Sequence, residues 1–470
     1  MAQTREYDEY DEAATDVGEV VAALIAALPE GAVVVDRDVV AAYRSDRAET
    51  VEAGWPVALV RATSTDDVQA TVKIAAAHRI PIVPRGAGSG LAGGASAIEG
   101  CILLCLEQMR AIHIDAPGMY AVVQPGLMNA EVKQAARAHG LWYPPDPSSY
   151  EFCSIGGNLA TNAGGLCCVK YGVTTDYVLA LEVVLADGRA IRLGGRTIKD
   201  VAGYDLKRLF VGSEGTLGII TEATLRLRPL PLAPCTMVAT FEDVIDAGRT
   251  VSAVMAIMRP ATMEMMDRAT VNAVERYRRM GLDTEAGATL IAQSDSGGAQ
   301  GAEEIAAMER IALEHGATFV ATTEDPEEGE MFLEARRLSF TSLFDLGTPL
   351  IEDVGVPIDR IAELVKGVED IAAEHQTLIA TVGHAGDGNF HPFISFDADD
   401  PDSTRRADRA FAAIIALALE LGGTITGEHG VGVVKAPYLI DQIGPDVLGL
   451  SRQIKGLLDP QGILNPGKFV

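Results

Sequence analysis

The sequence predicts a mixed α+β protein with two domains, and three observations support this. Its 470 residues exceed the roughly 100–200 residues of a single domain. Strand-like and helix-like segments alternate over residues 50–228 and again from residue 237 onward. Between these regions, residues 228–234 contain three prolines, which suit neither a helix interior nor a central strand. We therefore expect the domains to meet at this proline-rich stretch.

The N-terminal half contains patterns for helices, short buried strands and one hairpin. Ser64 precedes a run of apolar residues at helical spacing, which indicates an N-cap. Asp187-Gly188 is a typical turn between two antiparallel strands. In chain order we expect an acidic tail followed by a helix that ends at Leu28, a helix that starts at 64–67, a strand at 80–83, a helix at 131–139, a hairpin within 181–193 and a strand at 219–227.

The C-terminal half repeats the alternation and indicates an α/β or α+β domain. We expect strands at 237–241, 289–292, 318–322, 350–356, 378–382 and 390–396. We expect helices at 244–258, 303–315, 358–375 and 403–421, and a turn-rich tail at 459–470.

Composition and charge limit the possible functions. The net charge of −28 repels phosphate backbones and argues against general nucleic-acid binding. The longest apolar stretch spans only 20–28, whereas a membrane helix needs about 20 residues. The first twelve residues lack the features of a secretory signal, and the six cysteines show no zinc or ferredoxin spacing. We therefore expect a cytoplasmic protein with reduced thiols and no integral membrane segment.

Three glycine-rich segments suggest a binding site for a phosphate-containing ligand. Residues 86–94 include five glycines, whose bare backbone can approach a phosphate closely. The segment fits neither the Rossmann fingerprint nor a Walker loop, and a flexible surface loop is the alternative. Segments 154–165 and 212–219 are of the same kind. The rigid stretch 144–147, which lies between the first and second of the three segments, suits a wall against a flat ring system. Together they favour a large ligand with a pyrophosphate.

Three histidines and a glutamate form a candidate metal site. His384 and His391 flank a Gly-Asp-Gly-Asn turn, which can direct both imidazoles to one place. Glu428 and His429 lie together between two glycines further along the chain. Two histidines and a carboxylate suit Zn²⁺ or a similar divalent ion. The alternative is that one or two of these histidines only form hydrogen bonds within a turn.

Taken in order, residues 83–95, 144–149, 154–165 and 212–221 resemble the flavin-binding domain of vanillyl-alcohol-oxidase-type (PCMH-type) FAD enzymes. Within that group the sequence resembles the D-2-hydroxyacid dehydrogenases, which include the glycolate oxidase large subunit, D-lactate dehydrogenase and D-2-hydroxyglutarate dehydrogenase. The resemblance extends from about residue 50 to the C-terminus. It implies an N-terminal helical segment (1–50), a two-subdomain FAD-binding domain (51–230), an α+β cap domain with an antiparallel sheet and the metal site (235–445), and a C-terminal segment returning to the FAD domain (446–470).

The resemblance also implies how FAD is held, with its pyrophosphate on the 85–94 loop. Some relatives attach the flavin through a His or Cys in that loop, where this chain has Ser89, so we expect non-covalent FAD. Asn465 in the terminal segment is implied to reach the flavin. The implied FAD-binding residues are Pro84, Arg85, Gly86, Ala87, Gly88, Ser89, Gly90, Gly93, Gly94, Pro145, Asp146, Ser154, Gly156, Gly157, Asn158, Thr161, Asn162, Gly164, Gly165, Glu214, Gly215, Gly218, Ile219 and Asn465.

For the reaction, the resemblance implies His384, His391 and Glu428 as ligands of a divalent metal, with zinc first and manganese or iron as alternatives. It implies His429 as the base or hydroxyl partner and places Asn389 beside the substrate. Arg336 takes the position of the family's substrate arginine, and its planar fork suits a carboxylate. The resulting hypothesis is metal-assisted oxidation of a D-2-hydroxy acid to the 2-oxo acid, with hydride transfer to flavin N5.

The sequence departs from the D-2-hydroxyglutarate enzymes at positions that would hold a second carboxylate. Ile351, Phe393 and Phe340 stand where polar groups would be needed. These residues favour a short or apolar substrate such as D-lactate or glycolate. D-2-hydroxyglutarate dehydrogenase, an alkyl-dihydroxyacetone-phosphate-synthase-like enzyme without net oxidation, and a non-enzymatic nucleotide-binding module are the alternatives.

The electron acceptor stays open among a quinone, a cytochrome, an iron–sulfur partner subunit and O₂. A homodimer and peripheral attachment to a membrane through the acceptor also stay open.

Overall fold

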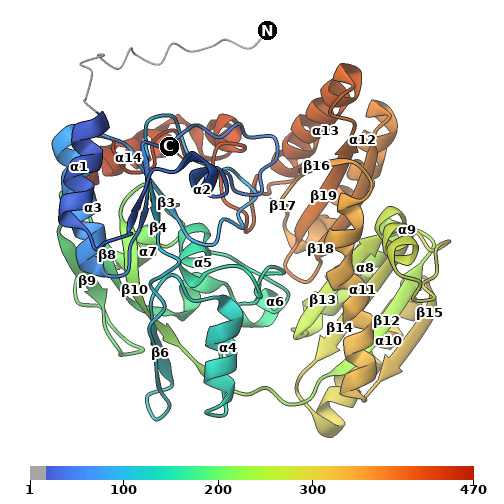
Figure 1. The fold of residues 1–470 in the computed structure, drawn as a ribbon. Helices are drawn as coiled ribbons and strands as arrows, with labels where there is room; N and C mark the ends of the chain where they lie inside the picture. Colours follow the sequence, from blue (N-terminus) through green and yellow to red (C-terminus); the bar gives the residue numbers. More distant parts are fainter. Residues whose placement is uncertain (1–16, 470) are drawn as a thin grey trace.

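The computed structural model describes residues 17–469, and Figure 1 shows its two halves side by side. The first part of the predicted acidic tail, residues 1–16, lies outside the described residues, as does Val470. The blue-to-green half holds the glycine-rich loops, whereas the yellow-to-orange half is built on one large sheet (Figure 1). The red helix α14 (Leu439–Leu458) returns to the first half, so both ends of the described chain lie there.

The first sheet follows the order β1-β2-β4-β3, and its β2, β4 and β3 strands are parallel. Its core includes the apolar faces of two helices, with Leu24 and Val72 fully buried. Ser64 and Asp67 form a reciprocal capping box at the start of helix α3, which confirms the predicted N-cap. The elements are α1 (Val17–Ala27), β1 (Val33–Val34), α2 (Arg37–Ala41), β2 (Ala58–Arg61), α3 (Thr65–His78), β3 (Ile82–Arg85) and β4 (Ile102–Cys105).

The second sheet is antiparallel and follows the order β5-β6-β10-β8-β9. The predicted hairpin is confirmed, since β8 pairs with β9 across the Asp187-Gly188 turn. Helices α4 and α5 contribute Val132 and Leu159 to the core of this region. The elements are β5 (Ile112–Asp115), β6 (Tyr120–Val123), α4 (Asn129–Arg137), β7 (Leu141–Trp142), α5 (Ile155–Thr161), α6 (Cys168–Tyr171), η1 (Thr174–Tyr177), β8 (Val178–Val184), β9 (Ala190–Gly194), α7 (Lys207–Phe210) and β10 (Ile219–Arg226).

The proline-rich stretch forms a minor two-stranded ladder. Its β11 strand (Arg228–Pro229) pairs with β7, after which the chain enters the large sheet. The C-terminal segment, after α14, contacts the first sheet as well. Ile82 donates its backbone N–H to Ile463 O at 2.7 Å and accepts from Asn465 N at 2.8 Å.

The large sheet is antiparallel, with the order β15-β12-β14-β13-β18-β19-β16, and β17 also pairs with β19. Alternate residues of one strand face opposite cores: Met265 faces the core of α8 and α12, whereas Met266 faces that of α9 and α11. Helices therefore cover both faces of this sheet (Figure 1). The elements are β12 (Cys235–Phe241), α8 (Val244–Ile257), β13 (Thr262–Asp267), α9 (Arg268–Tyr277), β14 (Ala288–Ser294), α10 (Gly298–Glu314), β15 (Ala317–Thr323), α11 (Pro326–Phe344), β16 (Thr348–Ile351), β17 (Val354–Gly355), η2 (Ile358–Arg360), α12 (Ile361–His375), β18 (Leu378–His384), β19 (Asn389–Phe396), α13 (Pro401–Glu420) and η3 (Ala436–Tyr438).

Two features of this sheet differ from the sequence prediction. The strand expected at 350–356 is wrong as a single element, because it is interrupted at Glu352 and Asp353. Pro392 lies opposite the interruption in β19; it accepts from Glu352 N at 2.9 Å but has no N–H to donate back. Strand β13 and the helix that follows it were not predicted.

Among the described residues, no helix combines the length and the apolar character needed to cross a bilayer. All six cysteines are free thiols.

Candidate functional site

A cavity of about 810 Å³ lies between the glycine-rich loops and the large sheet. This volume falls in the upper range of small-molecule and cofactor sites. Its lining combines two sets of residues from opposite halves of the chain. The first set is backbone-rich and comes from the predicted loops around residues 84–95, 156–161 and 213–220. The second set comes from the C-terminal half and includes the ionisable residues Arg336, His391, Glu428 and His429.

The glycines of the first wall fit a bulky ligand that approaches the backbone. A Cβ built on Gly90 would come no closer than 3.6 Å to another atom, and one on Gly157 no closer than 3.4 Å. Packing within the protein would therefore accept a side chain at both positions, but the side chain would occupy the cavity. Bare backbone at these points leaves room for a cofactor the size of FAD.

Other glycines of this wall are required by the protein itself. Gly88 has a φ of +69°, and a Cβ there would lie 1.9 Å from Nη2 of Arg85. The Arg85 guanidinium lies against the loop and donates to Ser45 O at 2.9 Å. Only glycine satisfies both the left-handed backbone and this contact.

Several predicted FAD residues support the loops from behind the cavity. Ser154 Oγ accepts from Ala87 N at 3.2 Å and joins two of the loops. Asn465 Nδ2 donates to Gly94 O at 2.9 Å and to Glu214 O at 2.8 Å, so the C-terminal segment fastens the first loop to the third. The predicted residues that line the cavity are Pro84, Arg85, Gly86, Ala87, Gly88, Ser89, Gly90, Gly94, Gly156, Gly157, Asn158, Thr161, Glu214, Gly215, Gly218 and Ile219. Those outside its lining are Gly93, Pro145, Asp146, Ser154, Asn162, Gly164, Gly165 and Asn465.

The predicted metal ligands come together at the other wall. Glu428 Oε1 lies 3.4 Å from His384 Nε2 and 3.3 Å from His391 Nε2. His384 and His391 are placed by β18 and β19, which pair through the turn between them. Ligand atoms of all three residues lie within 4.8 Å of one another.

This donor set fits a divalent cation. His384 Nε2 and Glu428 Oε2 are buried and have no hydrogen-bond partner within the described chain. Buried polar atoms of this kind are costly unless they are satisfied. Burial favours the neutral forms, yet the pKa of His384 is held well above its usual value by Glu264 and Glu428, and the neighbouring imidazoles hold the pKa of Glu428 well below its usual value. A cation would replace the proton between them.

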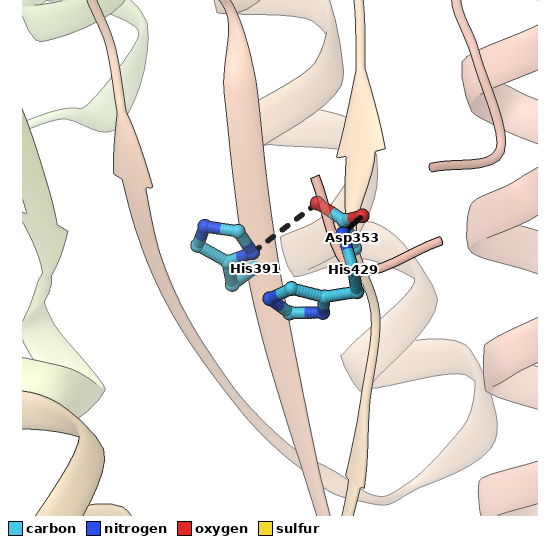
Figure 2. Close-up of side chains that lie close together, drawn as sticks. All are labelled: Asp353, His391 and His429. Carbon is cyan, nitrogen blue, oxygen red and sulfur yellow. Dashed lines mark hydrogen bonds and ion pairs between the residues drawn. The ribbon is translucent and has the colours of Figure 1, made fainter. Parts of the chain in front are cut away.

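A second set of possible ligands, Asp353, His391 and His429, is better explained as a structural centre. Figure 2 shows Asp353 beside the two imidazoles, which stack on each other with centroids 4.8 Å apart; Asp353 Oδ1 lies 3.6 Å from His391 Nδ1. Asp353 Oδ2 accepts from the backbone N–H groups of Gly427, Glu428 and His429 at 2.8–2.9 Å. It also accepts from Thr426 Oγ1, while Oδ1 accepts from Asn389 Nδ2. These donors already satisfy the carboxylate, which holds the turn that presents Glu428 and His429.

His429 has the properties of a base at neutral pH. Burial lowers its pKa, and Asp353 offsets this effect only in part. The neutral imidazole is therefore available to accept a proton, and it lines the large cavity.

Arg336 is buried on α11 and also lines the large cavity. Its Nε donates to Glu264 Oε2 at 2.7 Å. Its Nη2 is buried and has no partner among the described residues. The neighbouring Arg337, which also lines the cavity, is more exposed and pairs with Glu330 at the surface.

Asn389 and His384 lie on a second cavity, of about 460 Å³, on the other side of Glu428. Gly164 and Gly165 also line this cavity. The Asn389 amide donates to Asp353 Oδ1 at 2.9 Å and to Val354 O at 3.1 Å. Its predicted place beside the substrate stays a prediction.

Sequence reasoning missed two carboxylates, Glu264 and Asp353. Each lies in an apolar run, Met263–Met266 for the first and Leu350–Val356 for the second, and each is almost completely buried. An acidic residue at an inward position of a strand is rare unless it is paired. The sequence therefore contained a signal for Glu264 and Asp353, namely an acid within an apolar run. It did not identify their partners, because these come from distant segments.

Comparisons with known proteins agree with this geometry. The family model described as "FAD binding domain" matches residues 56–194, and that described as "FAD linked oxidases, C-terminal domain" matches residues 230–469. Glycolate oxidase subunit GlcD of Bacillus subtilis (strain 168) is 45% identical over 417 residues, which cover 88% of this chain and 89% of that protein. A D-lactate dehydrogenase of Archaeoglobus fulgidus is 37% identical over 437 residues, which cover 91% of this chain and 95% of that protein.

The solved structure of p-cresol methylhydroxylase with substrate bound has a TM-score of 0.81 at 20% identity, and the match covers 96% of both chains. This likeness concerns the fold alone, and it confirms the predicted fold class.

The family models and the relatives together define an FAD-linked oxidoreductase, and its fold contains a PCMH-type FAD-binding domain. The chain belongs to the FAD-linked oxidase family, and the predicted family resemblance is confirmed.

Proposed function

We propose that this enzyme oxidises a short 2-hydroxy acid, such as D-lactate or glycolate, to the 2-oxo acid. One observation carries the proposal: the flavin-type loops and the residues Arg336, His391, Glu428 and His429 line the same cavity. A substrate held by these residues would therefore lie against the flavin. Relatives named glycolate oxidase subunit GlcD and D-lactate dehydrogenase support this substrate class.

Arg336 is proposed to bind the substrate carboxylate. Its Nη2 is buried, without a partner in the described chain, at the edge of the cavity. A carboxylate would satisfy this donor through a charge-assisted hydrogen bond. His429 is proposed to take the proton of the 2-hydroxyl on its imidazole.

FAD, when bound, accepts the hydride equivalent released at C2, and a divalent cation, when held by His384, His391 and Glu428, polarises the 2-hydroxyl. The carboxylate anchor Arg336, the proton acceptor His429 and two of the cation ligands would therefore line the large cavity, while the third cation ligand, His384, lies behind Glu428 on the second cavity.

Aromatic residues favour a small or apolar substrate tail. Phe340 and Phe344 line the cavity, and Phe393 packs against both, with ring centroids 6.4 Å and 5.5 Å away. This cluster offers apolar contact and no charge to pair with a distal carboxylate. We therefore propose that D-lactate or glycolate is preferred to D-2-hydroxyglutarate.

A separate protein subunit is proposed as the electron acceptor, because relatives at 45% and 37% identity are named as glycolate oxidase subunits. Oxygen uptake tests this proposal. Stoichiometric O₂ consumption by the isolated chain during turnover would instead make it an oxidase.

Anaerobic flavin spectroscopy tests the proposed function. D-lactate, L-lactate, glycolate and D-2-hydroxyglutarate are added separately to the purified yellow protein. We expect D-lactate or glycolate to bleach the flavin absorbance, and L-lactate and D-2-hydroxyglutarate to do so far more slowly. A flavin that none of the four acids reduces would contradict the proposal and favour the synthase-like alternative.

A further inference from the structure

Glu264 contacts both Arg336 and His384. It lies in the middle of β13 and is only 1% exposed. Its Oε2 accepts from Arg336 Nε at 2.7 Å. The same carboxylate lies 2.9 Å and 3.0 Å from His384 Nδ1 through its two oxygens. One buried carboxylate therefore contacts both the arginine proposed for the substrate and an imidazole proposed for the metal.

We infer that Glu264 is a positioning residue that sets the orientation of both His384 and Arg336, and thereby joins cation binding to substrate binding. This inference rests on the proposed function, because it assigns a supporting role within that site.

On the cation side, Glu264 fixes the tautomer of His384. An ionised carboxylate can only accept, so Nδ1 of the imidazole must carry a proton toward it. Nε2 is then the nitrogen that faces Glu428, whose Oε1 lies 3.4 Å away, and the one that can give up its proton to a metal. Metal-binding histidines are commonly held in this way by an acceptor on the other ring nitrogen.

On the substrate side, Glu264 occupies one edge of the guanidinium. The bond to Nε fixes the plane of the Arg336 fork, because the guanidinium is rigid. The buried Nη2 remains available at the cavity. Without Glu264, Arg336 would also be a buried cation without its counter-charge, which is strongly unfavourable.

Replacement of Glu264 by Gln separates this role from simple packing. The amide has nearly the same shape, and its oxygen can still accept from Arg336 Nε. Its NH₂ group, however, would face the Nδ1 proton of His384. The Nδ1 proton would then have to share the amide oxygen, at the position of Oε2 3.0 Å away, with Arg336 Nε, or the imidazole would move its proton to Nε2, which is the atom needed for the metal.

Two measurements on the FAD-containing protein test the inference. Zinc affinity is measured by competition with a chromophoric chelator, after removal of bound metal. Pyruvate affinity is measured from the change in the flavin spectrum of the zinc-free protein. For E264Q we expect zinc affinity to fall about 10–100-fold. We also expect weaker pyruvate binding in the absence of zinc, because the Arg336 fork is no longer held.

The matched control is Asp267→Asn, which alters another carboxylate, partly buried, at the end of the same strand. Asp267 accepts from Thr270 N and Thr381 N at 2.7 Å. It contributes no contact to Arg336 or His384 in the described structure, so zinc and pyruvate should bind D267N as they bind the parent.

If E264Q binds zinc as tightly as the parent protein does, the inference is overturned. If E264Q does not fold, E264D decides the question. Its shorter side chain should weaken zinc binding about 3–10-fold, a smaller loss than that expected when the carboxylate behind His384 is replaced. An unchanged zinc affinity in E264D would again overturn the inference. Failure of the proposed function gives a different result. In that case the parent protein itself is not reduced by any hydroxy acid, whereas the zinc titrations still report on Glu264.

Discussion

The two walls of the large cavity are built on different physical principles. The wall from the N-terminal half presents backbone and small residues from the glycine-rich loops. The wall from the C-terminal half presents buried ionisable groups that hold one another, with Glu264 and Asp353 behind Arg336, His384 and the 427–429 turn. The first wall selects by shape and close approach, whereas the second acts through charge and proton position.

This difference separates cofactor binding from chemistry. A change in the charged wall should stop oxidation and leave FAD in place. A change in the glycine wall should release FAD and leave the ion cluster intact. The predictions below test that separation.

The largest effect is expected for His429→Gln. Loss of the proton acceptor should slow flavin reduction about 10²–10⁴-fold, the usual contribution of a general base. FAD content should stay at the parent level, because His429 belongs to the other wall. Anaerobic stopped-flow absorbance measures both quantities. The exposed His139→Gln variant should reduce at the parent rate. A His429→Gln enzyme that is equally fast would remove His429 from the mechanism.

The complementary change is Gly90→Ala. The added methyl has space within the protein, with its nearest neighbour at 3.6 Å, but it enters the cavity. Overpacking against FAD should weaken cofactor binding about 10-fold or more. Fluorescence titration of the apoprotein with FAD measures this loss. Gly449→Ala, on α14 with no atom within 4 Å of the added Cβ, is the control. Equal FAD affinities in the two variants would show that Gly90 does not border the cofactor.

An intermediate effect is expected for Asp353→Asn. The amide cannot accept from all the donors that converge on Asp353, so the turn carrying Glu428 and His429 should loosen. Substrate-driven flavin reduction should fall about 10-fold, with FAD retained. Exposed Asp359 provides the control variant Asp359→Asn. A parent rate in Asp353→Asn would mean that the turn is held by other contacts.

The smallest effect on activity, essentially none, is expected for Asp267→Asn, which should instead change the pH dependence of stability. Burial raises the pKa of Asp267 to about 6, above its ordinary 3.8. The folded state therefore keeps this proton to a higher pH than the unfolded state does. The free energy of unfolding falls as the pH rises from about 3.8 to about 6. The Asp267 contribution should decrease by about 1–2 kcal/mol between pH 5 and pH 7.5.

Urea unfolding of the parent and of the Asp267→Asn reference, both in excess FAD, measures this decrease. All measurements are made at pH values above the sequence pI of about 4.6. A stability difference between the two proteins that does not change with pH would contradict the raised pKa.

The two walls also differ in how well the sequence predicts them. The glycine segments and the His384–His391 turn are local patterns, and most of the predicted loop residues line the cavity. Glu264 and Asp353 could not be assigned, because their partners lie 36 or more residues away in the chain. Strand β13 was missed since Glu264 interrupts its apolar pattern. The break in the 350–356 strand depends on Pro392, which the sequence does not place opposite it.

Metal removal tests the separation of the two walls most directly. The purified enzyme is treated with a chelator, and its FAD content and its rate of anaerobic reduction by the preferred hydroxy acid are measured on the same sample. Zn²⁺ or Mn²⁺ is then added back. We expect FAD to remain bound throughout, reduction to be lost on chelation, and the rate to return with the metal. Reduction at the parent rate by metal-free enzyme, or loss of FAD together with the metal, would contradict this explanation of the site.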